Sequence, residues 1–236
     1  MWEHLRVLAR ACTEQLLDEI ESNRKIVAVG IDGEEIQGVF LDTDHWTEEG
    51  LAGLEAQLRR EAEDFRSADC PLDMQGLEDW LTKRSKAYHD EIGGLCRKAR
   101  LAALLSQIRS EMGEELCEAF RTQGFVLDGA SEPVFEELDE RKALLMDFVS
   151  RDRTHIAVRI VPDPEHFRNS LEIHSYDAEK LPESQLRARQ KDINALLTRS
   201  LQLDIAPDHE KKNADPAVRQ AFQEARSKLA PHGMMH

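Results

Sequence analysis

The sequence has few aromatic residues and no long apolar run. Phe, Trp and Tyr make up 6% of the 236 residues, so a core must be built largely from Leu, Ala, Ile and Val. No stretch of about 18 consecutive apolar residues occurs, and the N-terminal MWEHLRVLAR lacks the apolar centre of a signal peptide. The sequence therefore predicts a chain without a membrane span, and we expect a cytosolic protein.

Motifs typical of several enzyme classes are also missing. There is no GxGxxG or GxxxxGK[ST] loop for a nucleotide, no GxSxG elbow for a nucleophilic serine and no HExxH metal motif. The four cysteines form no CxxC pair, and we expect free thiols in a reducing compartment: Cys12, Cys70, Cys96 and Cys117. No cofactor is predicted.

Basic charge is in deficit. The chain has 46 Asp and Glu against 31 Lys and Arg, and its formal net charge is −15. Nucleic acids and anionic membranes carry the same sign, so direct binding to either is not expected. Basic residues gather within 83–109 and acids within 47–66, which favours pairing of these two segments. We expect a protein partner, with a second copy of this chain as one alternative.

Three long segments have apolar residues at the three- and four-residue spacing of amphipathic helices: residues 2–22, 47–66 and 74–121. Thr47 is expected to cap the second helix. Gly93 and Gly94 interrupt the third, and because each glycine costs about 1 kcal/mol relative to alanine, we expect a kink or short break there.

Two arrangements of these helices remain open. With a break at the glycines, residues 74–92 fold back on 47–66 as a helical hairpin, and residues 95–121 pack on the N-terminal helix. Without a break, residues 74–121 form one straight rod in an intermolecular coiled coil.

Shorter apolar segments with strand-like composition make up the rest of the predicted core. Residues 25–42 form a β-hairpin around Asp32-Gly33, a dipeptide typical of tight turns. Gly124 ends the helical region. Four strands are then predicted: 125–127, 144–149, 155–161 and 171–175.

The fold class is therefore α+β and mostly α, with long amphipathic helices and a small antiparallel sheet covered by a C-terminal helix at 182–203. We expect a helical region at 1–122 that includes the hairpin, a small α+β domain at 123–203, and a linker with a C-terminal helix or tail at 204–236.

Two clusters of polar residues are candidate sites. Asp42, Asp44 and His45 have the chemistry of metal ligands, although acids before a helix more often act as caps. Pro162-Asp163 followed by Glu172-Ile173-His174 resembles in part the PD-(D/E)xK pattern of metal-dependent nucleases, with His174 in place of the lysine. The alternative is that Glu172 and His174 form the solvent face of a half-buried strand.

The leading functional prediction is a non-catalytic assembly subunit of a cytosolic bacterial complex. Its contacts are expected on the apolar stripes of 74–121 and 182–203, at Leu95, Leu105, Ile108, Met112, Leu116, Leu186, Ile193 and Leu197. The first alternative is a metal-dependent nuclease or hydrolase that uses Asp163, Glu172 and His174. The second is an acidic inhibitor that mimics nucleic acid.

Overall fold

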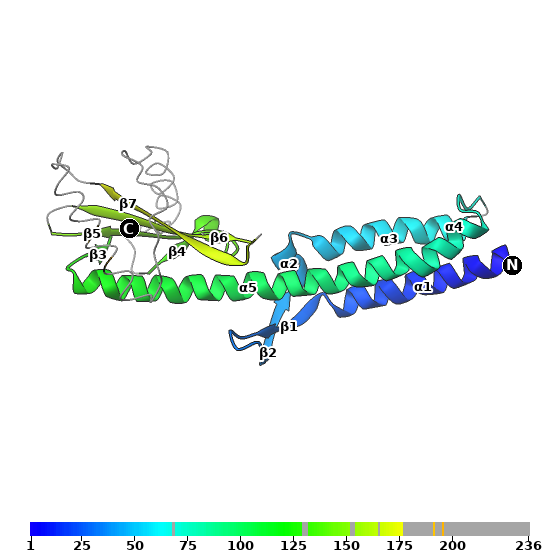
Figure 1. Ribbon diagram of the computed structural model, residues 1–236, viewed down its shortest axis with the longest axis horizontal. Coiled ribbons are helices and arrows are strands. Elements are labelled where there is room, and N and C mark those ends of the chain that lie inside the picture. Colours follow the sequence, from blue (N-terminus) through cyan, green and yellow to red (C-terminus); the bar gives the residue numbers. More distant parts are fainter. Residues whose placement is uncertain are drawn as a thin grey trace, which may run out of the picture. The chain divides into compact units, whose positions relative to one another are not determined.

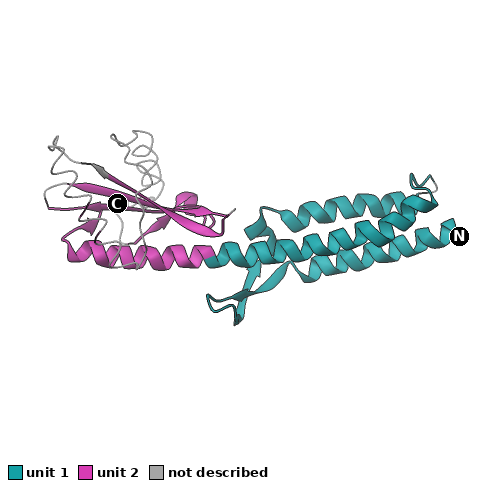
Figure 2. Ribbon diagram, in the orientation of Figure 1, with its two compact units in different colours: residues 1–104 teal, residues 105–236 magenta. Residues whose placement is uncertain are grey.

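The computed structural model describes residues 1–67, 69–128, 132–151, 154–164 and 166–176, together with residues 191 and 195. The predicted α+β class, with long helices and a small antiparallel sheet, is confirmed (Figure 1). The chain divides into two compact units, Met1–Leu104 and Leu105–His236 (Figure 2). Apart from residues 191 and 195, the predicted helix at 182–203 lies outside the described residues, as does 204–236.

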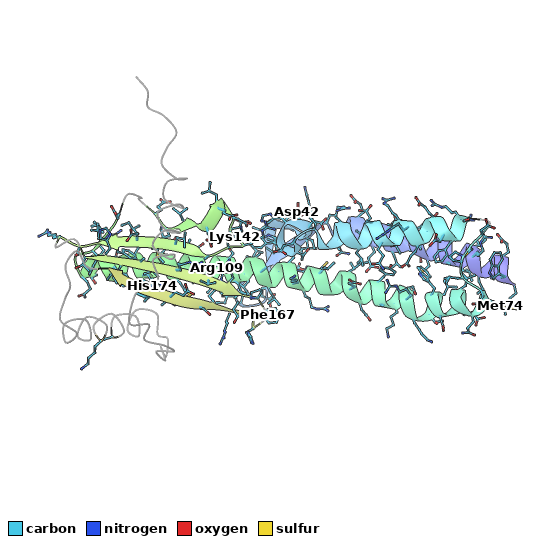
Figure 3. The ribbon with its side chains drawn as sticks, turned by 90° about the horizontal axis from the view of Figure 1, so that it is seen from above. Asp42, Met74, Arg109, Lys142, Phe167 and His174 are labelled. Carbon is cyan, nitrogen blue, oxygen red and sulfur yellow. The ribbon has the colours of Figure 1, made fainter. Side chains whose placement is uncertain are left out.

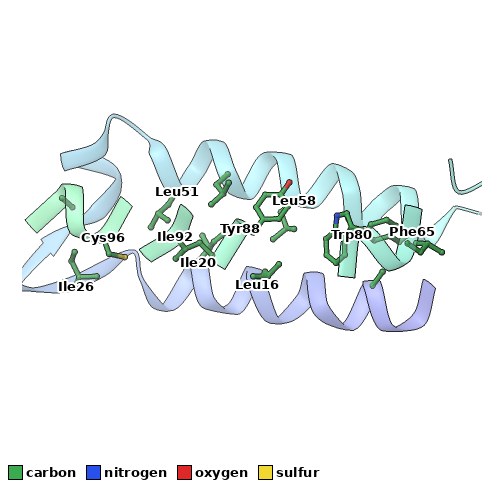
Figure 4. Packing of buried hydrophobic residues seen from close by; sticks show 14 residues of the cluster. Leu16, Ile20, Ile26, Leu51, Leu58, Phe65, Trp80, Tyr88, Ile92 and Cys96 are labelled. Atoms are coloured by element: carbon green, nitrogen blue, oxygen red, sulfur yellow. The ribbon is translucent and has the colours of Figure 1, made fainter. Parts of the chain in front are cut away.

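The first unit is built on three helical segments that lie side by side (Figure 1). They are α1 (Trp2–Ser22), α3 (Gly50–Arg66), and a run made of α4 (Met74–Asp79), the π-helical turn η1 (Trp80–Arg84) and the start of α5 (Ser85–Thr122). The chain turns back between α3 and α4. The helices enclose a core of mainly aliphatic residues with three large aromatic rings (Figure 4): Leu16, Ile20, Leu51, Leu58, Phe65, Trp80, Tyr88 and Ile92.

Helix α5 continues without interruption through Gly93-Gly94, so the break expected there is wrong. The side chains of Ile92 and Cys96, on either side of the pair, are buried in the core of the first unit. Burial of this kind offsets the low helix propensity of glycine, because most helix stability in proteins comes from tertiary packing. The irregular turn lies instead at η1, where Trp80 is buried.

Two acidic side chains cap the short helix α2 (Thr43–Thr47) and the start of α3. Asp42 Oδ1 accepts a hydrogen bond from the His45 amide at 3.2 Å, and Asp44 Oδ1 accepts one from the Ala52 amide at 2.9 Å. The expected cap at Thr47 is therefore wrong: Thr47 ends α2, and its hydroxyl donates to the carbonyl of Thr43.

Arginines join α1 to both ends of α3. Arg6 is buried, and its guanidinium donates to the carbonyls of Phe65 at 3.1 Å and Ser67 at 2.8 Å, which satisfies acceptors that a helix C-terminus leaves open. Arg24, just after α1, donates from Nη1 to Asp44 Oδ2 at 2.6 Å. The hydrogen bonds of Arg6 hold the start of α1 beside the turn that follows α3.

A separate two-stranded sheet belongs to the first unit. Strands β1 (Lys25–Val29) and β2 (Glu35–Asp42) pair in antiparallel register and do not join the larger sheet. Gly33 has φ +82°, which is the left-handed conformation that the predicted tight turn requires. The predicted hairpin is therefore confirmed.

The second unit packs the last turns of α5 against an antiparallel sheet. Its strands are β3 (Val126–Leu127), β4 (Val134–Phe135), β5 (Leu144–Val149), β6 (His155–Asp163) and β7 (Arg168–Tyr176), with a 3-10 turn, η2 (Glu136–Leu138), between β4 and β5. The order is β3-β5-β6-β7, and β4 also pairs with β5. The core contains Leu116, Phe120, Met146, Phe148, Ile156, Val158 and Ile160.

The end of α5 follows the predicted pattern. Gly124 has φ +84°, and the Phe125 amide donates to the carbonyl of Phe120 at 3.1 Å, which closes the helix C-terminus. Because the last turns of α5 pack on the sheet, the division of the chain falls at residue 104, within the helix, and not at its end.

Candidate interaction surface

The β1–β2 hairpin carries exposed apolar side chains that no described element covers. They belong to Ile31, Ile36, Val39 and Phe40, whose exposed fractions are 78%, 37%, 45% and 63%. We refer to these four side chains as the hairpin surface. Figure 1 shows the hairpin extending sideways from the helices of the first unit. An apolar group of this kind is a typical feature of surfaces that bind another molecule.

The outer edge of β2 also presents free backbone groups. The Thr43 amide donates to the Arg24 carbonyl at 2.9 Å, and antiparallel bonding alternates from there through the regular part of the pair, which ends at Val27 and Phe40. The amide and carbonyl of Phe40 therefore point away from β1. On the other side of the hairpin, Arg100 Nε donates to the Val27 carbonyl at 3.0 Å. Among the described residues, β2 pairs with β1 alone, so one edge of the hairpin is open to a further strand.

The charge of the hairpin is strongly one-sided. Carboxylates stand at both ends of β2, with Asp32, Glu34 and Glu35 at the turn and Asp42 at the far end, while Lys25 is the only base in residues 25–42. A second β2 strand in antiparallel pairing places acids opposite acids, which is unfavourable. The hairpin therefore favours a basic strand over another copy of itself.

The first predicted polar cluster, Asp42, Asp44 and His45, lies at the end of this hairpin. Both carboxylates accept the helix-capping bonds described above, and Asp44 also pairs with Arg24. In the described part of the chain, no group of metal-ligating side chains includes any of the three. The observed contacts of the two carboxylates are those of caps and of an ion pair, and the His45 ring lies edge-on to Trp46.

The second predicted cluster, Asp163, Glu172 and His174, lies on one face of the β6–β7 pair but does not converge. Glu172 is opposite Arg159, whereas Asp163 is four residues further along β6, about 13 Å away at the usual strand rise. Glu172 pairs with Arg159 at 3.0 Å.

Asp163 has a different set of partners. His166 Nδ1 and Arg168 Nε contact its carboxylate at 3.0 and 2.9 Å, and their hydrogen bonds hold the pKa of Asp163 below its usual value. Each of the two acids is thus held by its own cation, at separate points on the sheet.

Most of the predicted interaction residues on α5 build the cores of this chain. Leu105 and Leu116 are buried, Leu95 packs against the core of the first unit, Met112 packs against that of the second, and Ile108 is half-buried. The predicted positions on the C-terminal helix, Leu186, Ile193 and Leu197, lie outside the described residues. Each side chain of the hairpin surface is more exposed than any of the five predicted interaction residues on α5.

The sequence pattern predicts the hairpin but not its exposed surface. Val39, Phe40 and Leu41 are consecutive apolar residues in a strand, so both faces of β2 are apolar. Only the face of Leu41 reaches the core. A run of apolar residues without polar alternation, in a hairpin of only two strands, indicates that one apolar face stays uncovered by the chain itself.

Comparisons with models of known families, with curated proteins and with solved structures found no match to this chain. None of the helices in the described part of the chain has the length and apolar content needed to cross a membrane.

Proposed function

We propose that this protein is a non-catalytic assembly subunit of a cytosolic complex, and that it binds a partner protein through the β1–β2 hairpin. The observation that carries the proposal is the combination of an open β2 edge with the exposed hairpin surface. A hairpin of two strands is marginally stable by itself, and a third strand adds main-chain hydrogen bonds and covers apolar side chains.

The proposed occupant is an extended segment of a different protein, with alternating apolar residues and a Lys or Arg near each end. The apolar residues cover Phe40 on its face of β2, and the basic residues meet Glu35 and Asp42. Charge complementarity favours this occupant over a second copy of the chain and accelerates association.

The test is a comparison of variants in a pull-down from nuclease-treated lysate of the source organism, quantified by mass spectrometry. Phe40→Lys removes the central aromatic contact and adds a charge that repels a basic strand. We expect it to reduce recovery of the partner more than about tenfold, because loss of a buried aromatic anchor weakens binding by at least about 1.4 kcal/mol.

Phe167→Lys is the matched control. Phe167 lies at the turn between β6 and β7 (Figure 3). It is 58% exposed, close to the 63% of Phe40. It is expected to leave recovery unchanged. Recovery of the same proteins by wild type and Phe40→Lys, or the absence of any stoichiometric partner, contradicts the proposal. Assembly of the purified chain with itself, abolished by Phe40→Lys, shows that the occupant is a second copy.

A further inference from the structure

A second candidate site lies on the sheet of the second unit and is independent of the hairpin. Asp128, Asp147 and His155 each present one ligand atom, and the three atoms lie within 4.8 Å of one another. His155 Nδ1 is 3.5 Å from Asp147 Oδ1 and 3.9 Å from Asp128 Oδ2. The side chains are partly exposed, 36% for the histidine and 25% for each aspartate, although Asp147 Oδ1 itself is buried.

The strand ladder holds these residues on one face. His155 on β6 is opposite Val149 on β5, two residues from Asp147, and Asp128 follows β3 directly beside Asp147. The Asp128 amide donates to the Asp147 carbonyl at 2.7 Å, which holds Asp128 next to Asp147. Their sequence neighbours, Leu127, Phe148 and Ile156, point to the opposite face and pack in the core. The three groups therefore stand on a rigid, hydrogen-bonded support.

The spacing of the ligand atoms suits a shared metal ion. Ligands bound at about 2.1 Å are separated by roughly 3.0 to 3.5 Å in octahedral or tetrahedral sites. The observed 3.5 and 3.9 Å need only small side-chain rotations to reach these values.

The donor set indicates the class of metal. One imidazole and two carboxylates suit Mn²⁺ and Zn²⁺, whereas Mg²⁺ and Ca²⁺ prefer ligands that are all oxygen. We propose that Asp128, Asp147 and His155 bind one divalent transition-metal ion. Three protein ligands leave further coordination positions for water or a small ligand, as in open metal sites.

The Asp163–His166 pair provides a natural comparison on the same sheet. Its imidazole lies 3.0 Å from a carboxylate, but there is one aspartate instead of two. It therefore lacks the second anionic ligand, and we do not expect it to hold a metal ion.

Titration of the metal-free full-length protein with Mn²⁺ tests the site. Mn²⁺ is preferred as the probe because Zn²⁺ binds well to thiolates, and the free cysteines would compete for it with the proposed site. Binding is measured by calorimetry and by paramagnetic broadening of amide signals in NMR spectra. We expect one equivalent of Mn²⁺ to bind and to broaden the signals of His155 and its strand neighbours first. Asp147→Asn and His155→Gln are each expected to weaken Mn²⁺ binding by about tenfold or more. Asp163→Asn is expected to leave Mn²⁺ binding unchanged.

The outcomes separate the metal site from a simple ion pair. No binding up to about 1 mM Mn²⁺, or equal binding by wild type and both ligand variants, overturns the proposal and leaves a contact between a histidine and two aspartates only. If Asp147→Asn fails to fold, the binding of Mn²⁺ by His155→Gln and the broadening pattern of the wild type decide whether the metal site exists. Because neither readout involves the hairpin, failure of this test leaves the proposed partner binding unaffected.

Discussion

Arg109 Nη1 donates to Asn169 Oδ1 at 2.9 Å, and through this bond α5 is joined to β7 inside the second unit. Asn169 Nδ2 in turn donates to the carbonyl of Leu105 at 3.1 Å, and Arg109 Nη2 donates to the carbonyl of Glu140 at 2.7 Å. Arg109 is only 1% exposed, and within the described residues no carboxylate pairs with it. Burial lowers the pKa of Arg109 to about 10, so the guanidinium is charged at neutral pH.

Arg109→Ala is expected to lower the free energy of unfolding by about 3 kcal/mol or more. The substitution leaves a cavity and removes the donors to two partly buried acceptors, each worth about 1 to 3 kcal/mol when left without a partner. Urea denaturation measures the loss. The control is Arg121→Ala on the same helix, where the pair with Glu118 is about two-thirds exposed and the expected change is below about 1 kcal/mol. Equal losses in the two variants contradict a structural role for Arg109.

Tyr88 is expected to ionise about two pH units later than an ordinary tyrosine. Burial and the hydrogen bond from its hydroxyl to Glu61 Oε1 at 2.6 Å raise the pKa of Tyr88 to about 12. The folded state therefore holds a proton that the unfolded state loses above pH 10, so stability is full below pH 10 and falls as the pH rises toward 12.

Absorbance of tyrosinate near 295 nm follows this ionisation. The chain has two tyrosines, so the late phase corresponds to one of them and is expected to disappear in Tyr88→Phe. Stability of Tyr88→Phe is also expected to decline less between pH 10 and 12. Two tyrosines that both titrate near pH 10 in the folded protein rule out this prediction.

Two glycine positions on α5 and at its end are expected to respond in opposite directions to alanine. Gly94 is helical, and a Cβ there meets only the Arg97 guanidinium, at 3.9 Å, so Gly94→Ala is expected to stabilise the protein by up to about 1 kcal/mol. Gly124 has φ +84°, so Gly124→Ala forces a strained backbone and is expected to destabilise by about 1 kcal/mol. Thermal unfolding of the two variants measures the difference, and changes of the same sign contradict the argument.

Leu105 illustrates how the structure changes the choice of experiments. From the sequence, a charge at Leu105 is expected to abolish assembly. In the structure Leu105 is 9% exposed, and its carbonyl accepts the bond from Asn169, so Leu105→Glu is expected to unfold the second unit. Loss of a partner in that variant does not locate an interface, and Phe40→Lys is the sharper substitution.

Local patterns were sufficient for much of the fold. The turn at Asp32-Gly33, the end of α5 at Gly124 and the alternation of Ile156, Val158 and Ile160 all follow from backbone preference or from two-residue periodicity. These properties depend on residues close in the sequence, and for that reason the sequence alone determined the hairpin, the helix end and the inward face of β6.

Only the tertiary structure decided which polar groups meet. Asp44 caps α3 in place of Thr47, and Arg109 is buried because Asn169, 60 residues away, supplies an acceptor. Asp128, Asp147 and His155 come together only through strand register. Sequence spacing carries no information on such contacts, because they depend on how distant segments pack, and that packing is set by the sum of many burial and hydrogen-bond energies over the whole chain.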